Sequence, residues 1–162
     1  MATGVNLVKR LGKFAVVVRA GDGLVSTRMF NRYQRVANRL LLEGALPHEV
    51  DAALVRFGMA VGPFATADLA DGMSIPDPEA EALIVAASKA LGLQRRPVGD
   101  AEIVARCTAA MVKAGAMCLA EGLASRASDV DVIWVDAYGF PRHRGGPMYN
   151  AGQVDKVAPN HA

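Results

Sequence analysis

An all-α fold is predicted by three features of this sequence. Apolar residues make up 52% of the 162 residues and aromatic ones only 6%, a composition that favours closely packed helices over a β-sandwich. Apolar side chains recur every three or four residues over long stretches, which is the spacing of one helix face. The two halves of the chain also carry similar residues in the same order, which indicates two tandem copies of one helical unit packed against each other.

The internal repeat rests on short motifs that recur about 80 residues apart. Each copy has a Glu-Gly pair, then an Asp several residues later, then a Gly-Pro turn. The equivalent positions are Glu43-Gly44 and Glu121-Gly122, Asp51 and Asp131, and Gly62-Pro63 and Gly146-Pro147.

Residues 1–24 are expected to hold a short helix and the only strand. Residues 5–11 suit a helix that Gly12 ends. Residues 14–19 form a β-branched run between turn residues, which predicts a strand. Because a lone strand cannot satisfy its own backbone hydrogen bonds, it would pair with the same strand of a second molecule, giving a homodimer, or be displaced as the remnant of a sheet.

The first repeat, residues 25–93, is predicted to open with its longest helix. Apolar residues at Met29, Tyr33, Val36 and Leu40 step by four, three and four, and Glu43-Gly44 closes this helix. Two prolines keep residues 72–78 from being helical throughout. The helices expected in this repeat cover residues 25–42, 47–58, 63–71 and 79–91.

A polar linker at residues 94–99 precedes the second repeat, residues 100–157. Its long helix is predicted to start at an Asp100 N-cap and to run to Glu121. A second helix starts near Ala127, and a turn rich in Gly and Pro follows. The face of the long helix is formed by Val104, Cys107, Met111, Ala114 and Cys118, and a last helix is expected over 147–156, before a loose tail at 158–162.

Charge and composition argue against several classes of protein. A net charge of +2 is too small to indicate nucleic-acid binding, and the basic pairs at 9–10 and 95–96 suit a solvated surface. No apolar stretch is expected to span a membrane and no leader is visible. Cys107 and Cys118 lie ~16 Å apart along one helix and cannot bridge there. A cytoplasmic protein with two buried thiols is the expectation.

Three segments resemble the 3-hydroxyacyl-CoA dehydrogenases. Residues 10–28 are similar to the family's hinge, with its Gly-Lys and valine-rich strand. Residues 57–64, Phe-Gly-Met-Ala-Val-Gly-Pro-Phe, are similar to one of its turns. Residues 136–149 resemble the second-repeat signature of the multifunctional fatty-acid oxidation members. The resemblance runs from about residue 4 to residue 155.

The resemblance implies a fold like that of the C-terminal domain of 6-phosphogluconate dehydrogenase, with the two repeats packed as a pseudo-dimer. It implies the substrate-side domain of an enzyme that oxidises 3-hydroxyacyl-CoA to 3-oxoacyl-CoA in β-oxidation. The family's Gly-x-Gly-x-x-Gly turn does not occur in this sequence. NAD and the catalytic His and Glu therefore belong to a missing NAD-binding domain, and this chain alone is expected to bind no cofactor and to be inactive. The alternative is a free-standing helical interaction module.

The resemblance also indicates four site residues. In the family the Asn of an Asn-Arg pair in the hinge contacts the 3-oxygen of the acyl-CoA, and here Thr27 occupies that position, followed by Arg28. A threonine hydroxyl still donates or accepts a hydrogen bond. Arg142 and Arg144 flank His143 and would contact a CoA phosphate, although a surface turn with closely packed glycines is the simpler explanation.

The remaining polar residues suggest structure rather than chemistry. Asp51 and Asp131 lie early in helices, where a carboxylate suits the helix dipole. His48 is expected to be exposed, and no metal site is expected because the histidines are scattered.

Overall fold

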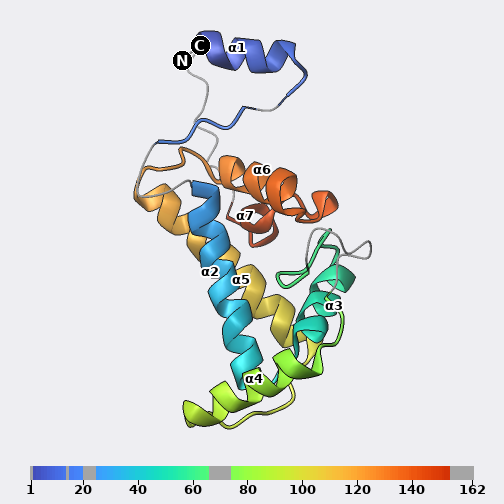
Figure 1. Ribbon diagram of the computed structural model, residues 1–162. Coiled ribbons are helices and arrows are strands. Elements are labelled where there is room, and N and C mark those ends of the chain that lie inside the picture. Colours follow the sequence, from blue (N-terminus) through green and yellow to red (C-terminus); the bar gives the residue numbers. More distant parts are fainter. Residues whose placement is uncertain (1, 14, 20–24, 66–73, 154–162) are drawn as a thin grey trace.

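The computed structural model describes residues 2–13, 15–19, 25–65 and 74–153, and over these residues the fold is all-α. Seven helices and one 3₁₀ turn make up the described elements, and the described residues contain no strand (Figure 1). The elements are α1 (Ala2–Arg10), α2 (Val25–Glu43), α3 (Pro47–Phe57), α4 (Pro78–Ala90), α5 (Asp100–Ala120), α6 (Ala127–Tyr138), η1 (Arg142–Arg144) and α7 (Pro147–Asn150).

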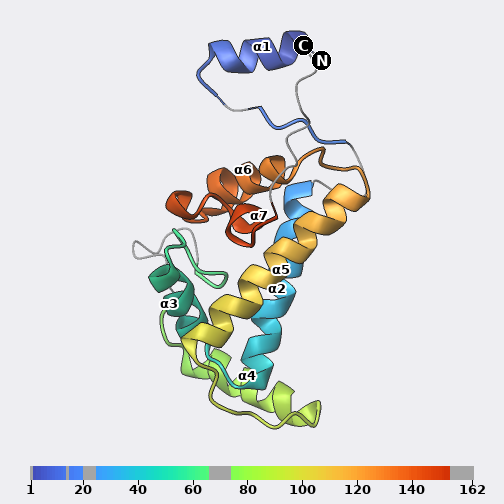
Figure 2. The ribbon, with the colours of Figure 1, turned by 180° about the vertical axis from the view of Figure 1, so that it is seen from behind.

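Helices α2 and α5 form the long axis of the molecule and lie side by side in opposite directions (Figures 1 and 2). The predicted pairing of the two long helices is confirmed. Gly115 of α5 faces α6 and α7 instead, since a Cβ there would lie 2.7 Å from Val130 and 2.9 Å from Met148. The buried faces comprise Val25, Met29, Tyr33, Ala37, Leu40 and Leu41 on α2, and Ile103, Cys107, Met111, Ala114, Gly115 and Cys118 on α5.

The remaining helices cover the two ends of this pair. Helices α3 and α4 pack at the end where α2 finishes, and α6 and α7 pack nearer to its start. Helix α1 lies apart from the others, beyond the end that carries α6 (Figure 2).

Helix α5 is long and apolar enough, by length and composition alone, to cross a membrane. The expectation that no stretch of the chain reaches this length was therefore wrong. In this fold the apolar surface of α5 serves helix packing, because α2, α3, α6 and α7 all pack against it.

The linker at 94–99 is held against the end of α2. The Arg96 amide donates to the Glu43 carbonyl at 2.9 Å, and the Arg95 guanidinium donates to the Leu41 carbonyl at 2.5 Å. Gly44 has a φ of +139°, and a Cβ there would overlap the Arg96 carbonyl oxygen. The prediction of a solvated Arg95 was wrong, since its side chain is half-buried and caps the carbonyls of α2.

The predicted strand at 14–19 was wrong over the described residues 15–19. Val18 forms a single antiparallel bridge with Ala124, and the Arg19 amide donates to the Leu123 carbonyl at 2.9 Å. A strand needs a neighbouring strand, and the nearest extended segment of this chain supplies one bridge only. Position 14 itself lies outside the described residues.

Two other predicted helices differ from the structure. Residues 63–65 are not helical, and most of the helix expected at 63–71 lies outside the described residues. Helix α7 ends at Asn150 and a turn follows, so the last helix is shorter than the predicted 147–156, of which 154–156 are not described. The α5 N-cap is Gly99, and Asp100 is the first helical residue.

An ion-paired carboxylate at the end of α2 gives the fold a measurable acid sensitivity. Hydrogen bonds from the Arg106 guanidinium lower the pKa of Glu43 from 4.5 to about 2. The stabilisation that this pair provides is therefore complete above pH 4.5 and is lost as the pH falls toward 2. Glu43→Gln should make the urea midpoint less dependent on pH in this window, whereas the control Glu79→Gln should keep the wild-type slope. An unchanged slope in Glu43→Gln would contradict this.

Candidate functional site

The two turns that carry the family resemblance lie against each other. Phe57 at the end of α3 contacts the Phe140 ring edge to face, with 5.8 Å between ring centroids. The Ala60 amide donates to the Gly139 carbonyl at 2.9 Å. Gly139 has a φ of +68°, and a Cβ there would lie 2.5 Å from the Ala60 Cβ. A glycine is therefore needed at 139 both for its backbone conformation and for this close approach.

Two buried aspartates hold the turns in the same way. Asp51 of α3 accepts hydrogen bonds from the backbone amides of Phe64 at 3.0 Å and Ser74 at 2.8 Å. Asp131 of α6 accepts them from the amides of Met148 at 2.7 Å and Tyr149 at 3.1 Å. The sequence analysis assigned both carboxylates to the dipoles of their own helices. The structure shows them bonded to the Gly-Pro turn further along the chain.

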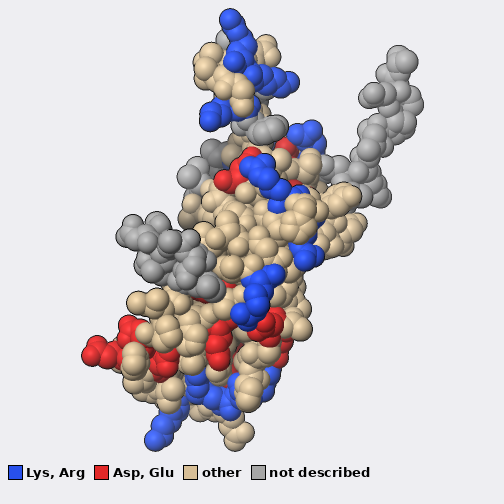
Figure 3. Space-filling view, turned by 90° about the vertical axis from the view of Figure 1, so that its right-hand side faces the viewer, with Lys and Arg blue, Asp and Glu red and all other residues tan. Residues whose placement is uncertain are grey.

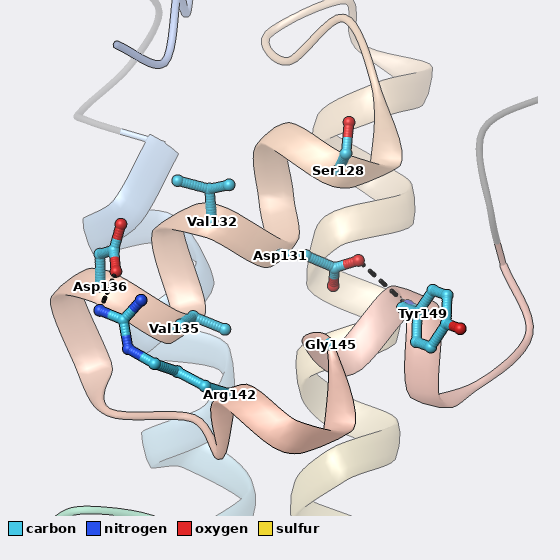
Figure 4. A pocket seen from close by; sticks show the side chains of 8 residues that line it. All are labelled: Ser128, Asp131, Val132, Val135, Asp136, Arg142, Gly145 and Tyr149. Carbon is cyan, nitrogen blue, oxygen red and sulfur yellow. Dashed lines mark hydrogen bonds and ion pairs between the residues drawn. The ribbon is translucent and has the colours of Figure 1, made fainter. Parts of the chain in front are cut away.

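A cavity of about 330 Å³ opens between α6, η1 and α7. Figure 4 shows the Arg142–Asp136 ion pair at one end and Asp131 with Tyr149 at the other, with Val132 and Val135 of α6 between them. The Asp131 carboxylate already accepts hydrogen bonds from α7. The cavity lining therefore presents mainly apolar surface, with Arg142 at the rim. The cavity is lined by Ser128, Asp131, Val132, Val135, Asp136, Arg142, Gly145 and Tyr149.

The two arginines expected to contact a CoA phosphate are both engaged within the chain. Arg142 donates to the Asp136 carboxylate at 2.6 Å, but its side chain is 74% exposed. The Arg144 guanidinium lies 4.3 Å from the centroid of the Phe57 ring, a cation–π contact. Arg142 therefore lies at the cavity rim, whereas Arg144 fastens the turn to α3.

Thr27 and Arg28 occupy the first turn of α2, in a different part of the structure. Thr27 is exposed. The Arg28 guanidinium pairs with the Glu121 carboxylate at 2.7 Å. Neither residue makes a hydrogen bond or ion pair with Arg142 or Arg144 in the part of the chain that the structure describes. The predicted site residues therefore form two separate groups, Thr27 with Arg28 and Arg142 with Arg144.

An aromatic cluster that the sequence did not predict joins α2 to α6. Phe30 stacks on Tyr138 with 5.0 Å between centroids, and Tyr33 meets Trp134 edge to face at 5.5 Å. The hydroxyl of Tyr33 and the Nε1 of Trp134 are buried and find no hydrogen-bond partner among the described residues. Burial strongly raises the pKa of Tyr33, so its phenol stays neutral. The spacing of apolar residues every three or four positions predicts that these side chains are buried. It does not predict which helix they pack against.

The two cysteines are free and buried, as predicted. Burial raises the pKa of Cys107 to about 12 and also raises the pKa of Cys118. Both thiols therefore remain protonated near neutral pH, and a protonated thiol is a poor nucleophile.

His48 lies in another cavity, of about 380 Å³, between α3 and α4. Its Nδ1 is 3.6 Å from the Glu81 carboxylate, and Ser74 lines the same cavity. The expectation of an exposed His48 was wrong, because α4 folds over the first turn of α3. Spacing along the chain gave no sign of this histidine–carboxylate contact.

Comparisons with known proteins agree with the resemblance seen in the sequence. The family model described as "3-hydroxyacyl-CoA dehydrogenase, C-terminal domain" matches residues 23–75. A peroxisomal bifunctional enzyme of Danio rerio is 31% identical over 215 residues, covering 95% of this chain and 30% of the relative. The Homo sapiens enzyme of the same name is 28% identical over 216 residues, with the same coverage. The fatty acid oxidation complex subunit alpha of Shewanella baltica is 26% identical over 193 residues, covering 92% of this chain and 27% of the relative.

The chain spans about 30% of the length of the curated relatives it matches. The matched region of the zebrafish enzyme extends over 215 residues, more than the 162 of this chain. Some positions of the zebrafish enzyme within the matched region therefore have no counterpart in this chain.

Proposed function

We propose that this chain is the substrate-side helical domain of a 3-hydroxyacyl-CoA dehydrogenase, because residues 23–75 match the model of that family's C-terminal domain. The reaction would be the NAD-dependent oxidation of 3-hydroxyacyl-CoA to 3-oxoacyl-CoA in fatty-acid β-oxidation. The helical domain would close over the acyl-CoA and exclude water, while a separate domain would hold NAD and the proton-transferring His.

The contact between the two signature turns carries this proposal. Residues 57–60 and 139–144 are joined by a backbone hydrogen bond, an aromatic pair and a cation–π contact. These interactions lock the two halves together and give the domain one rigid surface. Asp51 and Asp131 each accept a backbone hydrogen bond from a later turn, and this equivalence supports the proposal that the halves are tandem repeats packed as a pseudo-dimer. Residues 25–93 would be the first repeat and residues 100–157 the second.

The residue roles follow from where the side chains lie. Thr27, exposed on the first turn of α2, would hydrogen-bond the 3-oxygen of the substrate, with Arg28 beside it. Arg142, exposed at the cavity rim, would exchange the Asp136 carboxylate for a CoA phosphate, with Arg144 behind it. Free and buried Cys107 and Cys118 support a reducing compartment, and we propose the cytoplasm.

Calorimetric titration with acetoacetyl-CoA, followed by titration with NAD, tests this function. Acetoacetyl-CoA is expected to bind, and Thr27→Ala should weaken that binding about tenfold, since it removes one hydrogen bond to the substrate. The neighbouring Ser26→Ala serves as the matched control and should bind as the wild type does. NAD should not bind to the chain alone. Equal effects of the two substitutions, or an absence of acetoacetyl-CoA binding that persists when the NAD-binding domain of a complete relative is added, would overturn the proposed role.

A second candidate, a catalytically inactive interaction module, is favoured by one specific observation. Three of the four predicted site residues are occupied within the chain: Arg28 by Glu121, Arg142 by Asp136 and Arg144 by Phe57. If this candidate holds, acetoacetyl-CoA will not bind even after the NAD-binding domain of a complete relative is added. Binding that appears only with that domain present supports the first function instead.

A further inference from the structure

Ion pairs join α2 and α5 at both ends of their contact. Near the start of α2, Arg28 pairs with Glu121 at 2.7 Å. Near its end, Glu43 pairs with Arg106 of α5 at 2.5 Å, and Arg106 also reaches Glu102 at 3.1 Å. Because the helices are antiparallel, these pairs mark the two ends of one line of charged side chains along the seam.

The middle of this seam holds three cations. Arg32 and Arg35 of α2 and Lys113 of α5 line a hollow of about 220 Å³ whose floor includes Val36 and Ala110. None of the three makes a hydrogen bond or ion pair in the part of the chain that the structure describes. Arg28, Arg32, Arg35 and Arg39 step by four, three and four along α2, so they share one face of that helix.

Like charges at facing positions of two packed helices repel each other and destabilise the contact. A carboxylate at position 113 would have continued the pattern of ion pairs found at both ends. Figure 3 shows basic and acidic side chains next to one another over the main body of this face. All three side chains are exposed, so water solvates them in the free chain, and their combined positive charge would attract a small anion to the hollow.

The size and charge of the hollow limit what that anion is. A volume of about 220 Å³ equals the share of roughly seven water molecules at ~30 Å³ each. This suits a group of the size of pyrophosphate and is too small for a whole nucleotide. Arginine forks match phosphate oxygens in pairs, and lysine adds a compact positive charge.

We propose that the hollow between α2 and α5 binds a phosphate or pyrophosphate group. The site uses none of the residues assigned to the substrate above, so it stands independently of the proposed function. Two sources of the ligand share this chemistry: free pyrophosphate, or the phosphates of a larger molecule such as CoA. Thr27 lies eight residues before Arg35 on α2, ~12 Å along the helix axis, so a single extended ligand would reach both.

Titration of the chain with inorganic pyrophosphate at low ionic strength tests the site. Wild-type chain should bind, and each of Arg32→Gln, Arg35→Gln and Lys113→Gln should weaken binding about tenfold, the effect of one charged hydrogen bond. Arg39→Gln is the matched control, since it removes the same charge from the same helix face but Arg39 is paired with Glu43 at 2.8 Å. It should change the affinity less than about twofold. No binding by the wild type, or an equal loss in Arg39→Gln, would overturn the proposal.

A second variant separates binding from folding. Lys113→Glu should raise the urea midpoint, because it restores an opposite charge to the seam, and should abolish pyrophosphate binding. A lowered midpoint, or retained binding, contradicts the proposed arrangement.

Competition experiments identify the source of the group. If the hollow takes the phosphates of CoA, pyrophosphate will compete with CoA, and CoA affinity will fall in Arg35→Gln. If it takes free pyrophosphate, the two ligands will bind together. Both results support the site.

Discussion

Replacing Gly146 by alanine is expected to destabilise the fold by about 3 kcal/mol or more. Gly146 has a φ of +110°, a conformation that costs other residues on the order of 1–3 kcal/mol. A Cβ there would also overlap the Asp131 carboxylate, which accepts the Met148 and Tyr149 amides. Moving that buried carboxylate would leave the start of α7 without its acceptor. Urea unfolding followed by fluorescence of the single tryptophan measures the loss.

Gly152→Ala provides the control for this effect. Gly152 has a φ of +71°, but nothing lies within 4 Å of a Cβ built there. Its substitution should therefore cost only the backbone strain, about 1 kcal/mol. If the two variants lost equal stability, the contact with Asp131 would have no role in holding the turn.

Replacing Trp134 by alanine is expected to cost 3–5 kcal/mol, roughly the range for large buried aromatic residues. Its side chain is fully buried and meets the rings of Tyr33 and Tyr138 at centroid distances of 5.5 and 5.1 Å. The substitution would leave a cavity between α2 and α6 and remove both ring contacts. Circular dichroism during urea unfolding is the suitable measurement, since the variant contains no tryptophan.

Two further variants sharpen this result. Trp134→Phe should cost less than Trp134→Ala, because it keeps a ring and removes a buried N–H that has no partner. Leu83→Ala, at a side chain that is 72% exposed on α4, should stay within about 0.5 kcal/mol of the wild type. A loss of less than 1 kcal/mol in Trp134→Ala would mean that the aromatic cluster is not part of the stable core.

The helices could be predicted from the sequence because each one follows from local pattern. Apolar spacing identified α2 and α5, and the helices predicted to end at or near Gly44 and Gly58 do so, both glycines having positive φ. The prediction of a strand at 14–19 failed because a strand does not follow from local pattern alone. A strand depends on a partner elsewhere in the chain, and β-branched composition carries no information on whether one exists.

The candidate site could be predicted only as a set of residue names. The resemblance indicated Thr27, Arg28, Arg142 and Arg144, but whether a side chain is free depends on its neighbours in space. Glu121 beside Arg28 and Phe57 beneath Arg144 come from distant parts of the chain. For the same reason the sequence did not predict the His48–Glu81 contact. It also did not predict the hydrogen bonds that Asp51 and Asp131 accept from later turns.

The antiparallel pairing of α2 with α5 has a consequence for the order in which a new chain acquires its structure. Glu43 meets Arg106 and Arg28 meets Glu121, so every contact along this seam joins residues far apart in sequence. Residues 25–93 leave the ribosome first, and until α5 follows them the face of α2 that packs against α5 stays uncovered. The first half therefore waits as an exposed apolar surface that is prone to aggregation, and the core closes late, after a long loop has been brought together.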